Sequence, residues 1–172
     1  MSDSIKIILD GKTCECPIIT GVEGYKAVDI SKLLATTSHI TFDNGFANTG
    51  ACVSAITYLD GDKAILRYRG YPIQELAEHV TFTETSYLLL EGELPTAKQL
   101  QAFDKFVIKH LAVPEGVLKS LEGYPKGAHP MGSLAAAICS LAGHYPEALN
   151  PNPSADEITN IILQMLAKTN TL

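Results

Sequence analysis

Apolar and polar positions alternate in short stretches near the start of the chain, which predicts β-strands. Residues 5–9 and 13–19 flank Asp10-Gly11. Because an Asp-Gly pair accepts the positive φ angles of a tight turn, we expect an N-terminal hairpin there. Further along, the pattern predicts a short helix over 28–34 and a short strand over 40–42.

The stretch from residue 56 to residue 73 has the clearest pattern of the chain. Residues 56–58 are β-branched or aromatic, and residues 66–69 alternate apolar or aromatic side chains with charged ones. Asp60-Gly61 lies between them, so we expect a second hairpin in which Gly61 takes a positive φ. Pro72 then suits the first turn of a helix, where its missing N–H leaves no hydrogen bond unmade.

Helical patterns replace strand patterns after about residue 70. Three helix starts carry a capping box, in which Ser or Thr precedes Glu or Gln by three positions. Residues 131–145 are almost all small or apolar, so we expect a helix that is buried on most sides. The predicted fold is mainly α-helical with a small N-terminal antiparallel β-unit, the β-unit spanning 1–70 and the first helices of a larger body 71–172. The capping pairs are Thr81 with Glu84, Thr96 with Gln99, and Ser154 with Glu157.

Composition and charge narrow the functional classes. Of the 172 residues, 46% are hydrophobic and 19% are charged, as expected of a chain that folds around a core. A net charge of −6 argues against a nucleic-acid or anionic-membrane partner, and no apolar run approaches the length of a membrane span. The four cysteines lack disulfide spacing and the polar start does not resemble a secretion signal. We therefore expect a soluble cytoplasmic protein with reduced thiols.

Two motifs carry a resemblance to a known family. Asp60-Gly61 followed by Ile65–Ile73 (ILRYRGYPI) closely resembles the segment that links a small β-region to the helical body in citrate synthases. His129-Pro130-Met131 is similar to the HPM opening of a long buried helix in the same family. The resemblance implies the N-terminal part of the citrate synthase fold, of the long bacterial type with an N-terminal β-unit.

The resemblance implies an acyltransferase of the tricarboxylic acid cycle, which joins acetyl-CoA to oxaloacetate to give citrate and CoA. This chemistry needs a carboxylate to remove a methyl proton, a neutral His to stabilise the enol, and cations to hold the dicarboxylate. In the family these groups come from the later part of the sequence, and none matches a position in 1–172. We therefore expect an N-terminal fragment without catalytic residues, inactive alone, that uses no metal and no resident cofactor.

The expected partners are the remainder of the same polypeptide, small-molecule substrates, and further copies of the chain in a homo-oligomer, a dimer or a hexamer. Two alternatives stay open. A 2-methylcitrate synthase, which uses propionyl-CoA, would differ at residues outside this chain. A non-enzymatic helical interaction or regulatory module would have kept only this portion of the enzyme.

With this kind of β-unit, the chain resembles the long bacterial citrate synthases. The resemblance implies a hexamer that NADH inhibits at an allosteric site far from the catalytic one. By resemblance, that site corresponds to Lys109, His110, Tyr145 and Lys168. Lys109 stands where Arg is typical, and Lys holds a phosphate as a point charge without the bidentate fork of Arg. Gln164 stands where another Arg would help. We therefore hypothesise a weakened or absent NADH site, and the alternative is a polar rim of solvent-facing helix ends.

Three further candidates have plain structural explanations. His129 precedes the apolar helix without an acid partner, so we expect a hydrogen-bonded structural role rather than catalysis. Arg67 and Arg69 share one face of the predicted strand and could bind a phosphate or carboxylate, but a solvated or inter-subunit face is the commoner explanation. Cys14 and Cys16 by themselves are a weak metal signal.

Overall fold

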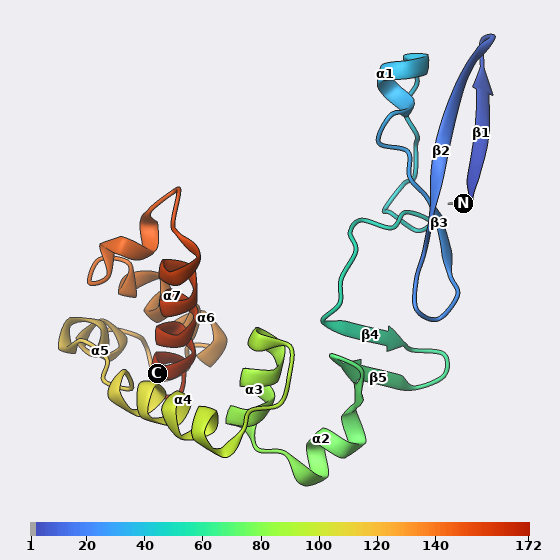
Figure 1. The fold of residues 1–172 in the computed structure, drawn as a ribbon. Coiled ribbons are helices and arrows are strands. Elements are labelled where there is room, and N and C mark those ends of the chain that lie inside the picture. The colour runs from blue at the N-terminus through green and yellow to red at the C-terminus, as the bar shows by residue number, and fades with distance from the viewer. Residues whose placement is uncertain (1–2) are drawn as a thin grey trace. The chain divides into compact units, whose positions relative to one another are not determined.

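Contacts divide the chain, in this computed structural model, into one unit that ends at Ser54 and a second that runs from Ala55 to Leu172 (Figure 1). The structure describes residues 3–172. Seven α-helices and two three-stranded sheets fall within these residues, so the predicted class, mainly helical with a small β-unit, is confirmed. The predicted boundary near residue 70 lies inside the second unit, because the second sheet packs with the helix that follows it.

The first unit is built on an antiparallel sheet of β1 (Ser4–Leu9), β2 (Lys12–Thr20) and β3 (Lys26–Val28), in that order. Asp10 and Gly11 join β1 to β2 with φ angles of 48° and 76°. Two consecutive positive φ angles are what a two-residue hairpin turn requires, so the predicted hairpin is confirmed in detail.

A small core covers one face of this sheet. Cys14 and Cys16 point to the same side of β2 and pack with Leu33 of α1 (Leu33–Thr37). The helix that we predicted over 28–34 thus begins later, because Val28 is used by β3. The strand predicted over 40–42 is wrong: these residues pair with no strand, and the side chains of two of them, Ile40 and Phe42, are exposed.

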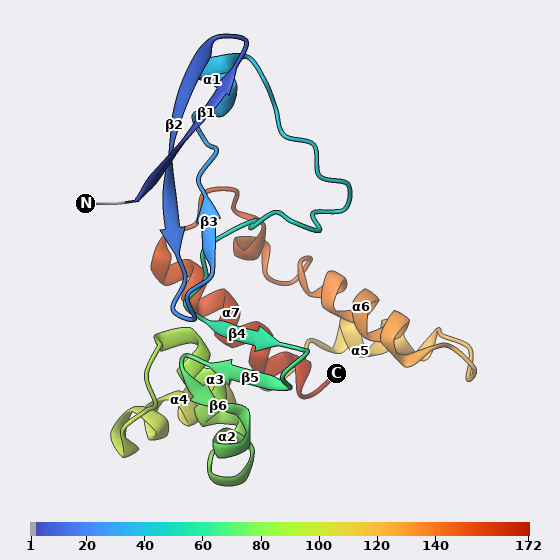
Figure 2. The same ribbon diagram turned by 90° about the vertical axis from the view of Figure 1, so that its right-hand side faces the viewer.

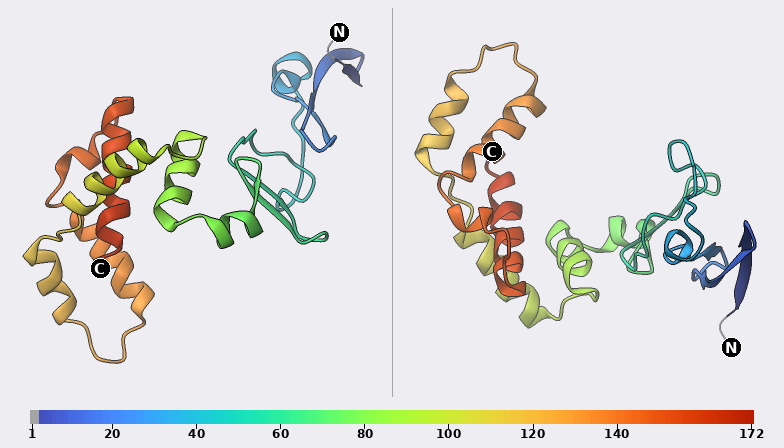
Figure 3. Two further views of the ribbon diagram at one scale, coloured as in Figure 1. Left: turned by 60° about the horizontal axis from the view of Figure 1, so that its bottom comes forward. Right: turned by 90° about the horizontal axis from the view of Figure 1, so that it is seen from above.

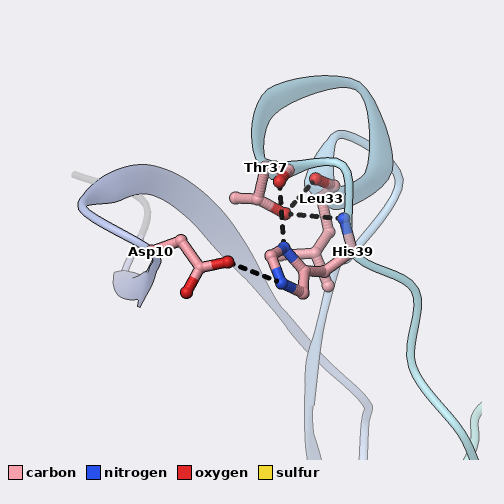
Figure 4. A network of polar contacts seen from close by, with 4 residues as sticks. All are labelled: Asp10, Leu33, Thr37 and His39. Atoms are coloured by element: carbon pink, nitrogen blue, oxygen red, sulfur yellow. Dashed lines mark hydrogen bonds and ion pairs between the residues drawn. The ribbon is translucent and has the colours of Figure 1, made fainter.

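A polar network closes the C-terminal end of α1 (Figure 4). The Thr37 hydroxyl is buried, donates to the Leu33 carbonyl at 2.8 Å and accepts from the His39 backbone N–H at 3.2 Å. The His39 ring lies between two acceptors, with Nδ1 at 2.9 Å from the Thr37 carbonyl and Nε2 at 3.3 Å from the Asp10 carboxylate. The network therefore connects the β1–β2 turn to the residues that follow α1.

The second sheet pairs β4 (Thr57–Asp60), β5 (Ile65–Tyr68) and β6 (Tyr71–Pro72), again antiparallel and in chain order (Figure 2). The predicted hairpin is confirmed, but its turn differs from our expectation. Gly61 does not take a positive φ; Ala64 does, at 54°. The Asp60 carboxylate accepts from the Lys63 backbone N–H at 3.0 Å, and this bond sets a four-residue loop in place of a two-residue turn.

Helix α2 (Ile73–His79) follows the sheet directly. Pro72 precedes its first turn in an extended conformation and so lies one position before the place that we predicted. The later helices are α3 (Phe82–Glu91), α4 (Ala97–Lys109), α5 (Glu115–Glu122), α6 (Pro130–Leu141), the 3₁₀ helix η1 (Pro146–Leu149) and α7 (Ala155–Thr169).

All three predicted capping boxes are confirmed, at the starts of α3, α4 and α7. In each, the hydroxyl of the N-cap residue accepts from the backbone N–H three positions on, and the Glu or Gln side chain there accepts from the N-cap backbone N–H. Local sequence therefore determines where these helices begin.

The core of the second unit lies among its last helices, which group near the C-terminus in two further views (Figure 3). Val117 of α5 packs with Ala137 and Leu141 of α6, and Met165 and Leu172 pack against them. Helix α6 is buried on this side alone: Met131 is 61% exposed, and we expected burial on most sides. Within residues 3–172, no helix has the length and apolarity needed to cross a membrane.

Candidate functional site

The four residues predicted for a regulatory site lie at the ends of three helices. Lys109 is the last residue of α4, and His110 follows it. Tyr145 precedes η1, and Lys168 is in the last turn of α7. Lys109 is exposed, whereas Lys168 is only 3% exposed.

Lys168 is the centre of this group. Its ammonium donates to the His110 carbonyl at 2.9 Å and to the Ala112 carbonyl at 3.1 Å. It also lies 4.7 Å from the centre of the Tyr145 ring, within the range of a cation–π interaction. The structure thus brings together the Lys168 side chain, the Tyr145 ring and the backbone of His110.

The His110 ring faces its own helix. Nδ1 lies 2.8 Å from the Phe106 carbonyl, which can only accept, so Nδ1 carries the proton. The ring is also stacked on the Phe106 ring, with centroids 4.1 Å apart. The Nδ1 side of the imidazole therefore completes the end of α4.

A groove of about 190 Å³, open to solvent, runs between α6 and α7 beside η1. Most of its lining is apolar, and the two charged residues that line it are Glu147 and Lys168. Gln164 lines it as a neutral amide, while Lys109 and His110 are not among the lining residues. The groove offers apolar surface, one aromatic ring from Tyr145 and one buried cation.

A second, shallower hollow lies in the first unit. It is lined by Ile30, Leu33, Leu34, His39, Ile40 and Thr41. The His39 ring that lines it belongs to the network of Figure 4.

Comparison with known sequences decides the family. Residues 45–172 match the family described as "Citrate synthase, C-terminal domain". This match covers well over half of the chain and includes both motifs noted in the sequence. The chain belongs to the citrate synthase family.

Two curated relatives and one solved structure illustrate the similarity. "Citrate synthase 1" of Mycobacterium tuberculosis is 41% identical over 170 residues, which are 99% of this chain and 39% of that protein. "Citrate synthase" of Corynebacterium glutamicum is 41% identical over 169 residues, 97% of this chain and 38% of that protein. The crystal structure of citrate synthase from Thermotoga maritima matches 74% of this chain and 32% of its own, with a TM-score of 0.60 and 28% identity.

The chain therefore spans about two fifths of the length of these citrate synthases. The predicted recognition of the family is confirmed, and so is the predicted fold, a helical part of the citrate synthase fold with a small β-unit. The position of the four regulatory candidates relative to a ligand stays a prediction.

One arginine of the citrate synthase segment ILRYRGYPI has a role that sequence reasoning missed. We expected Arg69 to share a strand face with Arg67. Arg69 instead lies beyond the end of β5 with φ of 49°, so the two side chains do not share a face. Its guanidinium donates to the Leu89 carbonyl of α3 at 2.7 Å. Arg67 lies over the ring of Tyr58, its cross-strand partner, at 5.6 Å. The sequence signal for this break was the Gly that follows Arg69.

His129, the first residue of the HPM motif, is the N-cap of α6. Its Nδ1 accepts from the Met131 backbone N–H at 3.2 Å, which agrees with the structural role that we expected. Cys14 and Cys16 form a core cluster, and burial raises the pKa of the Cys16 thiol. Among the described residues, no group of three or more His, Cys, Asp or Glu side chains is arranged to hold a metal ion.

Proposed function

We propose that this chain is the N-terminal portion of a citrate synthase, an acyltransferase that condenses acetyl-CoA with oxaloacetate to citrate and CoA in the tricarboxylic acid cycle. The observation that supports the proposal is the 41% identity over 99% of the chain with citrate synthase 1 of Mycobacterium tuberculosis. Because the chain covers 39% of that relative, the remainder of the enzyme would come from further polypeptide.

We propose that the reacting groups lie in that further polypeptide. A general base that removes a proton from the methyl carbon of a thioester works best with a pKa near the working pH. The carboxylates of residues 3–172 with shifted pKa values, Asp29, Asp43, Asp60, Glu84 and Glu157, are all lowered, mainly by hydrogen bonds from neighbouring residues. These groups serve turns and helix caps, which supports a scaffolding role for this portion.

Regulation and assembly complete the proposal. NADH is the expected allosteric ligand in relatives of the long bacterial type, and Lys109, His110, Tyr145 and Lys168 are the corresponding residues of this chain. We propose that the NADH site is weakened or absent here, because Lys109 stands where Arg is typical and Gln164 stands where another Arg would help. We propose a cytoplasmic homo-oligomer, a dimer or a hexamer. The exposed side of α6, which includes Met131, supports further packing partners for this helix.

The test is the release of the CoA thiol from acetyl-CoA in the presence of oxaloacetate. It would be run on residues 1–172 and on the full reading frame that contains them, side by side. Activity in the longer protein but not in residues 1–172 would support the proposal. Activity of residues 1–172 on their own would refute the placement of the reacting groups in further polypeptide. Propionyl-CoA run in parallel identifies a 2-methylcitrate synthase if it reacts faster than acetyl-CoA. A silent full-length protein would favour the non-enzymatic module.

A further inference from the structure

Three successive carbonyls of the α4–α5 turn accept hydrogen bonds from the last turn of α7 and from the residues just after it. Lys168 donates to the carbonyls of His110 and Ala112, and the Thr171 hydroxyl donates to the carbonyl of Leu111 at 2.8 Å. These partners are 56 to 60 residues apart in sequence. The end of α7 therefore binds this turn through every one of its backbone acceptors from 110 to 112.

Within residues 3–172 Lys168 forms no ion pair with a carboxylate, and backbone carbonyls suit such a buried cation. The turn follows the C-terminal end of α4, where unpaired carbonyls and the helix dipole create negative potential. The Tyr145 ring adds a further favourable surface at 4.7 Å. An ammonium carries three N–H donors. Two of them meet carbonyls at 2.9 and 3.1 Å, and the ring covers a further side.

We infer that Lys168 is a positioning residue that fixes the α4–α5 turn on α7, and that it does not bind the phosphates of a dinucleotide in this protein. Lys168 is only 3% exposed, so a phosphate could reach its ammonium only by displacing the Tyr145 ring or one of the two carbonyls. The other charged residue that lines the groove, Glu147, repels an anion, and Gln164 adds no charge. The residues of the groove thus do not fit NADH, and the resemblance-based role of Lys168 is replaced by a structural one.

The inference is tested on the full-length protein with two measurements that do not depend on catalytic activity. Amide hydrogen exchange of residues 110–113 reports the hold on the turn, and nicotinamide fluorescence in a titration reports binding of NADH. The variants are Lys168→Met, Thr171→Val, which removes one donor without a change of charge, and Lys105→Met, which removes an exposed lysine of α4 as a matched control.

We expect exchange of 110–113 to rise about tenfold or more in Lys168→Met, to rise less in Thr171→Val and to stay unchanged in Lys105→Met, because hydrogen bonds to charged groups are the stronger ones. We expect no saturable NADH binding that depends on Lys168. Saturable binding in the original protein that Lys168→Met abolishes, with exchange of 110–113 unchanged, overturns the inference. Unchanged exchange in both Lys168→Met and Thr171→Val overturns it as well. Only the regulatory meaning of the result rests on the proposed function, and the CoA-release assay tests that function separately.

Discussion

Arg69 donates a hydrogen bond from its guanidinium to the Leu89 carbonyl, at 2.7 Å, and so joins the end of the second hairpin to the last turn of α3. Carbonyls in the last turn of a helix have no N–H partner within the helix. The neighbouring Leu88 carbonyl accepts from the Gly92 N–H, whereas Leu89 depends on a side chain 20 residues earlier. This contact helps to tie the citrate synthase motif to the helical body.

Replacing Arg69 with Met should lower the free energy of unfolding by about 1–3 kcal/mol, because the Leu89 carbonyl loses its charged donor. The measurement is urea denaturation of the full-length protein followed by circular dichroism. Lys119→Met is the control, since Lys119 forms only an exposed pair with Glu115 at 2.7 Å and should cost about 0.3–0.5 kcal/mol. Equal effects of the two substitutions would refute a capping role for Arg69.

The two Asp-Gly pairs should respond differently to the same change, Gly to Ala. Gly11 has φ of 76°, which an L-residue rarely adopts, so Gly11→Ala should destabilise its hairpin by about 1 kcal/mol. Gly61 has no left-handed φ and no atom within 4 Å of an added Cβ. Gly61→Ala should therefore be neutral or stabilise by about 0.4–1 kcal/mol, through lower entropy of the unfolded chain. Amide exchange of each hairpin checks this locally, and destabilisation by Gly61→Ala would contradict the observed turn.

Acid should loosen the starts of α3 and α7 but not that of α4. Hydrogen bonds from Thr81 and from Ser154 lower the pKa of Glu84 and of Glu157 below their unfolded values. A lowered folded-state pKa contributes stability that is present above the unfolded pKa and is lost as the pH falls through the folded pKa. The third box of this kind carries Gln99, which does not titrate.

The measurement for this prediction is amide exchange of the first turns of α3, α4 and α7 in a pH series, corrected for the intrinsic pH dependence of exchange. Protection should fall at low pH in α3 and α7, while α4 serves as an internal control. Glu157→Gln should make α7 behave like α4. A parallel loss of protection in α4 would mean that the capping carboxylates are not responsible.

In the network of Figure 4, the buried Thr37 hydroxyl should matter more than the contact between His39 and Asp10. Thr37→Val keeps the shape but leaves the His39 backbone N–H without its acceptor, so we expect a loss of about 1–3 kcal/mol. Asp10→Asn removes the charge from an exposed pair whose Asp10 side chain is 83% exposed, so the loss should be below about 1 kcal/mol. Urea denaturation of both variants measures the two losses in the free energy of unfolding. A larger loss in Asp10→Asn than in Thr37→Val would contradict the prediction that the buried hydroxyl matters more.

Errors of the sequence-based predictions have local physical causes. The strand predicted over 40–42 had suitable residues, but a strand needs a partner, and no neighbouring strand pairs with it. Gly61 follows Asp60 as Gly11 follows Asp10, yet the Asp60 carboxylate bonds to the Lys63 N–H and moves the positive φ to Ala64. The turn propensity of Asp60-Gly61 therefore identified the hairpin but did not determine the length and conformation of its turn.

The burial of α6 shows a second limit. An apolar helix is expected to be covered on most sides, but residues 3–172 cover only the side that carries Ala137 and Leu141. The sequence pattern of a single helix predicts how much of its apolar surface should be buried. It does not predict which other segment packs against that surface.

Sequence by itself determined the three capped helix starts, the Asp10-Gly11 hairpin and, through two motifs, the family. The capped helix starts and the hairpin depend on residues only a few positions apart, and the family is indicated by two short sequence motifs. Long-range packing therefore has little influence on any of them. Tertiary structure alone decided that Arg69 caps α3 and that Lys168 is buried against His110 and Ala112, 58 and 56 residues away. A long cationic side chain can reach solvent, a ligand or a distant carbonyl, and only the packing of the helices selects among them.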